Sequence, residues 1–219
     1  MNYRWVQASL ELFRVFQEVG GRRLVAAGTC AEYDWRYGFC SEETTPTDPS
    51  SLYGTAKDAL RRVLLSWSQQ EDVSSAWGRV FFLYGPHEHP DRFVPSAIRS
   101  FLRGETFTCM TGDHVRDYLY VQDVADAFVS LLGSAVTGVV NIASGRPRCV
   151  AEIARELAGQ MHAESLLDVK TALATNGDAP LLVGDARRLM RDVGWTPKYD
   201  MSDGLTQTIQ WWKEQGTML

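Results

Sequence analysis

The hydrophobic positions of the chain alternate between helical spacing and short apolar runs. Val6, Leu10, Phe13 and Phe16 recur every three or four residues and predict a helix over 3–19. The run 24–27 that follows lies between glycines, as is typical of a parallel strand buried on both faces. The same two patterns recur downstream. They predict helices at 53–70, 95–103, 122–132, 150–161, 185–193 and 203–214, and strands at 76–83 and 139–142. This alternation predicts an α/β fold, in which helices cover both faces of a parallel sheet.

Composition limits the class of protein. The 219 residues allow one domain or two closely joined ones, and 45% hydrophobic with 22% charged residues is ordinary for a globular protein. The net charge of −5, without basic clusters, argues against nonspecific nucleic-acid binding. No apolar run approaches the roughly 18 residues of a membrane helix, and the N-terminus has no secretory pattern. We therefore expect a cytoplasmic protein with neither nucleic acid nor membrane as a partner.

The cysteines and histidines give no metal-binding pattern. The four cysteines, Cys30, Cys40, Cys109 and Cys149, form no C-x-x-C motif, and the four histidines are scattered. We expect no metal site, and free thiols fit a reducing compartment.

Candidate chemistry begins with Tyr53 and Lys57. Residues four apart on a helix lie on one face, so the ammonium can lie beside the phenol. An adjacent cation favours the phenolate, and such a pair can move a proton as an alcohol is oxidised or a carbonyl reduced. Because many helices carry this pair by chance, its meaning depends on the surrounding sequence.

The surrounding sequence contains several further motifs in a fixed order. These are the strand and loop Arg23–Tyr33, the acidic loop Ser41–Pro46, Gly78–Pro86, Val115–Ala125 and Val140–Gly145. In this order and spacing, from about Leu10 to Trp212, the chain resembles the extended short-chain dehydrogenase/reductase family. That family comprises nucleotide-sugar epimerases, dehydratases and ketoreductases. The resemblance implies a Rossmann-like parallel sheet with a smaller C-terminal substrate-binding subdomain.

The resemblance implies catalytic roles for three residues. Tyr53 would be the general acid/base, and it would contact the cofactor together with Lys57. Lys57 would favour the phenolate and bind the nicotinamide ribose of NAD or NADP. Thr29, four residues before Tyr33, would bind the reacting oxygen; the alternative is a strand-end hydroxyl bonded to backbone.

It also implies substrate contacts. Arg116 would bind the phosphates of a nucleotide sugar, the alternative being a solvent-exposed arginine. His87, after Gly-Pro, would face the substrate as a polar loop residue or act as a second acid, and Tyr33 would also contact substrate. Cys30 is one place away from a position where some relatives carry a catalytic cysteine; a small buried side chain is the alternative.

Two departures from the family pattern are visible. No G-x-G-x-x-G or G-x-x-G-x-x-G turn occurs, so we expect the first strands of the cofactor half to be missing and hydride transfer by this chain alone to be weak. The resemblance implies that 1–84 with about 117–144 would form a partial dinucleotide-binding half, and about 85–116 with 145–219 the substrate-binding part. Cys30-Ala31 stand where 4,6-dehydratases carry Asp-Glu, so elimination of water is not expected.

These observations lead to one hypothesis and two alternatives. The hypothesis is an NAD(P)-dependent epimerase or 4-ketoreductase of a nucleotide sugar, with a homodimer formed through a helix pair that includes 53–70. The alternatives are a noncatalytic remnant that binds sugar nucleotides or a partner subunit, and a reductase of a non-sugar carbonyl. The sugar, the nucleotide and the choice between NAD and NADP stay open.

Overall fold

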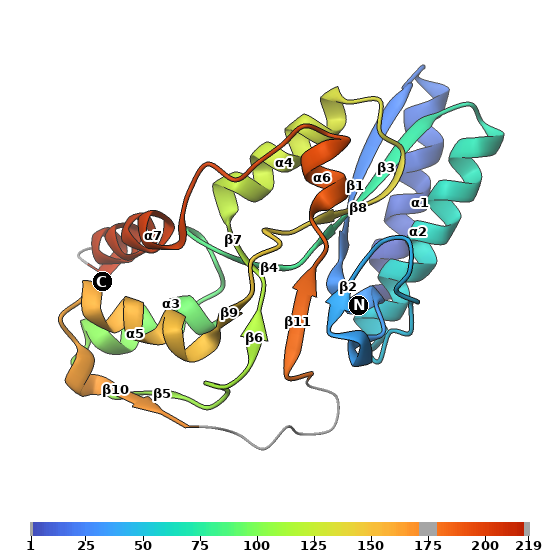
Figure 1. Ribbon diagram of the computed structural model, residues 1–219. Helices are drawn as coiled ribbons and strands as arrows, with labels where there is room; N and C mark the ends of the chain where they lie inside the picture. Colours follow the sequence, from blue (N-terminus) through green and yellow to red (C-terminus); the bar gives the residue numbers. More distant parts are fainter. Residues whose placement is uncertain (1, 171–178, 217–219) are drawn as a thin grey trace.

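The computed structural model describes residues 2–170 and 179–216, and it has the expected α/β fold with parallel strands. Figure 1 shows two groups of elements. One is built around the strands β1, β3 and β8, and the other around the helices α3, α5 and α7. Within the described ranges, no helix is long and apolar enough to cross a membrane.

The main sheet consists of three parallel strands in the order β1-β3-β8. Their bounds are Arg23–Thr29, Ser74–Val80 and Gly138–Ile142. In Figure 1, α1 (Asn2–Glu18) and α2 (Leu52–Gln70) lie on one side of these strands. Helices α4 (Val121–Gly133) and α6 (Arg187–Arg191) lie on the other side. The helices therefore cover both faces of the sheet, as the apolar runs of the strands predict.

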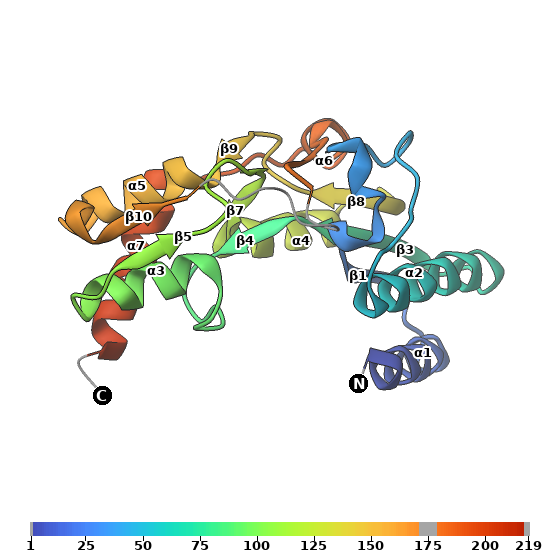
Figure 2. The ribbon, with the colours of Figure 1, turned by 90° about the horizontal axis from the view of Figure 1, so that it is seen from below.

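Strand β3 shows how the sequence pattern produces these layers, because its successive side chains point to opposite faces of the sheet. Trp77 packs with Phe13, Leu60 and Leu64 of the two helices on one face. Ala76 belongs to the core of the other face, with α4. Figure 2, seen from below, shows that α1 lies beyond α2, and its main contact is with α2.

The predicted strand 76–83 is wrong as a single strand. Strand β3 ends at Val80, and β4 (Phe82–Tyr84) pairs instead with β7 (Tyr118–Tyr120). The chain changes partners here: the Phe81 amide donates to Ile142, and the Phe82 amide donates to the backbone of Asp117. Val80, Phe81, Phe82 and Leu83 are all hydrophobic, so the sequence pattern could not show the change at this junction.

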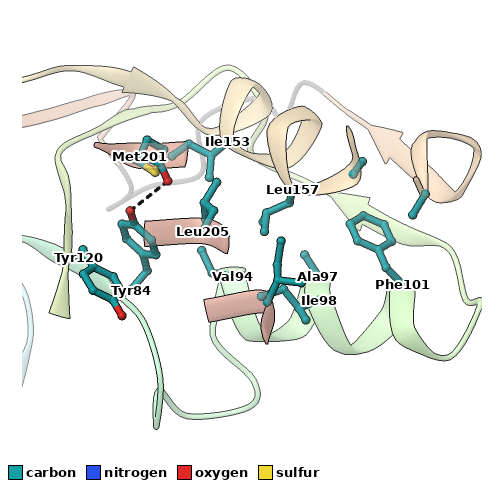
Figure 3. Packing of buried hydrophobic residues seen from close by; sticks show 13 residues of the cluster. Tyr84, Val94, Ala97, Ile98, Phe101, Tyr120, Ile153, Leu157, Met201 and Leu205 are labelled. Atoms are coloured by element: carbon teal, nitrogen blue, oxygen red, sulfur yellow. Dashed lines mark hydrogen bonds between the residues drawn. The ribbon is translucent and has the colours of Figure 1, made fainter. Parts of the chain in front are cut away.

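The second group of elements packs α3 (Phe93–Leu102), α5 (Val150–Gln160) and α7 (Met201–Gly216) around a common core. Figure 3 shows Ile98, Leu157 and Leu205 among its residues, with the hydroxyl of Tyr84 donating to the carbonyl of Met201. The short parallel pair of β5 (Phe107–Cys109) and β10 (Leu167–Val169) lies beside these helices. Tyr84 follows β3 closely in the chain, so this contact connects the two groups.

A small sheet of order β2-β11-β6-β9 lies between the groups. Its strands are Phe39–Cys40, Leu181–Gly184, Val115–Arg116 and Arg148–Cys149. The buried carboxylate of Asp117 accepts hydrogen bonds from the amides of Ser144, Gly145 and Gly184, 2.8, 2.9 and 3.2 Å away. The described residues also include the single-turn helices η1 (Cys30–Glu32), η2 (Trp35–Tyr37) and η3 (Glu164–Leu166).

Candidate functional site

The N-terminal turns of α2 carry Tyr53 and Lys57 to the end of strand β1. The hydroxyl of Ser51 caps the helix by accepting a 3.1 Å bond from the amide of Gly54. A Cβ atom at Gly54 would lie 2.3 Å from the carbonyl oxygen of Ala31, so only glycine allows this helix to approach η1 so closely. The close approach of α2 to η1 therefore explains why a glycine follows Tyr53.

Lys57 is fixed from this helix onto the strand. Its ammonium donates a 2.8 Å hydrogen bond to the carbonyl oxygen of Ala27, two residues before Thr29. Burial lowers the pKa of Lys57, and the negative charge of Glu32 acts in the opposite direction. An ammonium has three donors, so Lys57 can donate further hydrogen bonds to a bound molecule.

Tyr53 and Lys57 line the same hollow. Its volume is about 330 Å³, and Ala56 and Leu60 of α2 face Asn2, Trp5, Val6 and Ser9 of α1 across it. Tyr53 is 46% exposed. Two of the predicted catalytic residues therefore share one accessible cavity.

Thr29 is the last residue of β1 and is only 9% exposed. Its hydroxyl oxygen accepts a 3.2 Å bond from the amide of Ala31 and caps η1. This is the backbone-bonded arrangement that the sequence allowed as an alternative. That bond uses the hydroxyl oxygen as an acceptor, and the Thr29 side chain also hydrogen-bonds with the Cys30 thiol, which lowers the pKa of that thiol in part.

Glu32 is a residue that sequence reasoning missed. Its side chain is fully buried, and its carboxylate accepts bonds from the Thr29 amide (2.9 Å), Trp77 Nε1 (2.9 and 3.1 Å) and Arg79 Nε (2.7 Å). Arg61 of α2 adds an ion pair at 3.7 Å. The available signal was a charged residue inside an apolar segment, with an arginine and a tryptophan on the next strand.

Arg116 lies on β6 and is 5% exposed, so the solvent-exposed alternative is wrong. Its guanidinium donates to the Val115 carbonyl at 2.9 Å and contacts His114 Nδ1 at 3.1 Å. It also lies 5.5 Å from the centre of the Phe82 ring. Arg148 is its direct partner on the antiparallel strand β9, which brings a second, exposed arginine to the same place.

His87 and Tyr33 are not among the residues that line the hollow of Tyr53 and Lys57. His87 is exposed, has a positive φ of 66°, and its ring packs on Trp211 of α7, 4.7 Å between centroids. Tyr33 is 1% exposed and donates a 2.8 Å bond to Asn141 Oδ1. Tyr33 also lines a separate hollow of about 550 Å³, together with Trp35 and Tyr37. The roles assigned to these two residues stay predictions.

Burial raises the pKa of two further groups. Burial raises the pKa of the Cys30 thiol to about 12, which makes it a neutral thiol near pH 7 and supports the small buried side chain. Glu88, which sequence reasoning did not single out, has a buried carboxylate oxygen without a hydrogen-bond partner, and burial raises its pKa to about 7. A carboxyl poised near neutrality is typical of proton-transfer groups.

Fold and motifs together define a Rossmann-like α/β protein with a tyrosine–lysine helix beside its parallel sheet. The sequence model of the NAD dependent epimerase/dehydratase family matches residues 2–143. The chain belongs to that family. The resemblance inferred from its motifs is thereby confirmed.

Individual relatives agree with this assignment. The dTDP-D-glucose 4,6-dehydratase of Bos taurus is 28% identical over 182 residues, which cover 79% of this chain and 50% of the bovine protein. UDP-glucuronic acid decarboxylase 1 of Xenopus tropicalis is 26% identical over 217 residues, or 94% of this chain and 50% of that protein. The chain thus spans about half the length of the curated relatives it matches.

Solved structures show the same fold. The UDP-N-acetylglucosamine 4-epimerase of Methanobrevibacter ruminantium, in complex with UDP-N-acetylmuramic acid, matches with a TM-score of 0.88. It is 21% identical, and the match covers 95% of this chain and 68% of that one. The UDP-glucose 4-epimerase of Thermotoga maritima, with UDP-glucose, gives a TM-score of 0.84 at 25% identity, with 94% and 68% covered.

Proposed function

We propose that this chain forms the substrate-binding and proton-transferring part of an NAD(P)-dependent epimerase or 4-ketoreductase that acts on a nucleotide sugar. The observation that carries the proposal is the placement of Tyr53 and Lys57 in one cavity, with Lys57 bonded to the end of the strand that carries Thr29. By this proposal, 1–84 with about 117–144 belong to the dinucleotide-binding half, and about 85–116 with 145–219 to the substrate-binding part.

The residues present fit the nicotinamide end of the cofactor. Lys57 has N–H donors left for ribose hydroxyls, and the hollow beside it is partly apolar because Trp5, Val6 and Leu60 line it. The sequence contains no glycine-rich turn of the kind that binds a dinucleotide pyrophosphate. We therefore expect a polypeptide of these 219 residues to bind NAD or NADP weakly and to transfer hydride slowly.

A bound nicotinamide dinucleotide would supply the hydride acceptor and donor. Tyr53, as a phenolate, would take the proton of a sugar hydroxyl onto its own oxygen, so that the O–H bond breaks while the C=O bond forms. In the reverse direction, the Tyr53 hydroxyl would return this proton to the oxygen of the ketone. Lys57 holds positive charge near the phenolate, and the Thr29 hydroxyl donates to the reacting oxygen.

Arg116 and Arg148 would bind the diphosphate of the sugar nucleotide. Residues directly opposite on antiparallel strands have side chains on the same face, and like charges placed there repel. An anion between them relieves that repulsion, and the planar guanidinium matches phosphate oxygens bidentately. This arrangement favours a charged sugar nucleotide over a neutral carbonyl substrate.

A thermal-shift screen tests the proposal. The ligands are UDP-, GDP-, CDP- and dTDP-sugars, NAD and NADP, with free sugars and nucleoside monophosphates as controls. A nucleotide sugar at 100 times its Kd should stabilise the folded chain by about 2.7 kcal/mol, which raises Tm by a few degrees. If no nucleotide sugar shifts Tm, the proposal fails. If a nucleotide sugar binds but no hydride transfer is ever detected, the noncatalytic alternative is favoured.

A further inference from the structure

A carboxylate lies fully buried directly beneath the proposed site. Glu32 comes from η1, and its hydrogen-bond donors come from β1 and from Trp77 and Arg79 of β3. Taking an ionised carboxylate out of water costs several kcal/mol unless charge and hydrogen bonds compensate for the lost hydration. Here four donor contacts, the guanidinium of Arg79 and the nearby Arg61 provide that compensation.

The absence of a side chain at Gly28 leaves room for the carboxylate of Glu32. A Cβ atom at Gly28 would lie 2.0 Å from Trp77 Nε1 and 2.6 Å from Glu32 Oε1. Any side chain at this position would therefore separate the indole from the carboxylate. Gly28 immediately precedes Thr29, so the hydrogen bonds of Glu32 and the position of the Thr29 backbone depend on the same close packing.

The indole of Trp77 connects Glu32 to Lys57. Its N–H donates to both carboxylate oxygens, and the Lys57 ammonium lies 6.0 Å from the centre of the same ring. A ring whose N–H is bonded to an anion gains electron density on its face, and that face attracts a cation. Glu32 thus acts on Lys57 both through the indole and through its own charge.

We propose that Glu32 is a positioning residue for the tyrosine–lysine site. Its carboxylate fixes the backbone of Thr29 and the ring of Trp77, and through them it keeps the Lys57 ammonium charged and bonded at the end of β1. The catalytic meaning of this inference rests on the proposed function, but the physical coupling does not. The other charges packed around Glu32 are Arg79 on β3, and Arg61 with its partner Asp58 on α2.

Lysine side-chain NMR tests the coupling directly. The chain has four lysines, Lys57, Lys170, Lys198 and Lys213, so the Cε and Nζ resonances are few enough to assign. We expect Glu32→Gln to lower the measured pKa of Lys57 by about one unit, as removal of a nearby opposite charge does. Lys198, ion-paired with Asp126, serves as the internal control and should not change.

A second variant keeps the test decisive, because Glu32→Gln leaves Arg79 buried without its counter-charge and can prevent folding. Trp77→Phe removes the indole N–H but leaves the Glu32–Arg79 ion pair in place. It should lower the pKa of Lys57 by a smaller amount than Glu32→Gln does. If Lys57 titrates as in the wild type in Trp77→Phe and in any folded Glu32→Gln protein, Glu32 is merely structural and the inference is overturned.

The result of the lysine NMR test can be distinguished from the result of the thermal-shift screen. A response of Lys57 to Glu32 together with no binding of any nucleotide sugar would overturn the proposed function alone. Binding of a nucleotide sugar with no response of Lys57 would overturn the positioning role alone.

Discussion

The ammonium of Lys57 donates to the carbonyl oxygen of Ala27 at 2.8 Å, and this bond fastens the start of α2 to the end of β1. It spans 30 residues of sequence, and it sets the place of Lys57 relative to Thr29, the last residue of the strand. The proposed chemistry therefore depends on a contact between two elements and not on the helix alone.

Replacement of Lys57 should weaken the binding of NADH or NADPH and leave the free energy of unfolding nearly unchanged. Because Ala27 is exposed, water can replace the lost donor, and we expect Lys57→Met to change the free energy of unfolding by less than about 1 kcal/mol. The Kd for NADH or NADPH, measured by fluorescence titration, should rise about tenfold or more, since hydrogen bonds from charged groups are worth about 1.5–3 kcal/mol. Lys198→Met, at an exposed ion pair, is the matched control. An equal Kd in both variants would exclude a ribose contact.

Replacement of Arg116 should distinguish a sugar nucleotide from a neutral substrate. Arg116→Lys keeps the charge but loses the planar fork, so binding of the best nucleotide sugar should weaken about tenfold or more. Arg103→Lys changes an exposed arginine paired with Glu105 and should leave that affinity unchanged. Calorimetric titration gives both values. An unaltered affinity in a folded Arg116→Lys protein would favour the non-sugar carbonyl alternative.

Glu88 should make the fold less stable as pH rises. Its pKa is about 7 in the folded chain and 4.5 as a free side chain, so between these values the folded state holds a proton that the unfolded state has released. Stability therefore falls between pH 4.5 and 7, and the loss persists above pH 7. Glu88→Gln should be more stable than the wild type at pH 8 by about 1–2 kcal/mol, after allowance for solvent screening, and nearly equal to it at pH 5.

Urea unfolding at both pH values measures this difference. Glu105→Gln, at an exposed position, should show no such pH-dependent gain. A gain of the same size at pH 5 and pH 8 would mean that the carboxyl of Glu88 does not titrate as described.

The exposed side of α1 leads us to propose a homodimer. Ala8, Leu12, Val15 and Val19 are all exposed and follow the three–four spacing of a helical seam, while Phe13 packs toward α2. A second copy could cover this stripe, which would bring two α1–α2 pairs together. Leu12→Glu should convert a dimer to a monomer in light scattering after gel filtration, whereas Gln7→Glu, off the stripe, should not. A wild-type monomer at high concentration would contradict the proposal.

The sequence predicted the long elements of this fold well because their patterns are local. The periodicity of Val6, Leu10 and Phe13 predicts α1 nearly to its ends. The two-residue strands β2, β6 and β9 were missed because so short a segment has no period, and they form only where distant segments meet. The change of partner at Phe81 was missed for the same reason.

The candidate site was predictable only in part. Tyr53 and Lys57 are separated by one helical turn, so their common face follows from the sequence alone. The contacts of Glu32 with Trp77 and Arg79 span 45 and 47 residues, and no local rule pairs a charge in a loop with one in a later strand. The positions of Arg116 and His87 also depend on tertiary packing, which buries the first and turns the second toward α7.

A crystal structure of the chain with the nucleotide sugar selected by the thermal-shift screen tests the central claim most directly. We predict that a sugar hydroxyl lies about 2.6–3.2 Å from both the Tyr53 and the Thr29 hydroxyl oxygens, with the diphosphate against Arg116. A sugar ring bound away from Tyr53, with its hydroxyls out of reach of both side chains, would contradict the account.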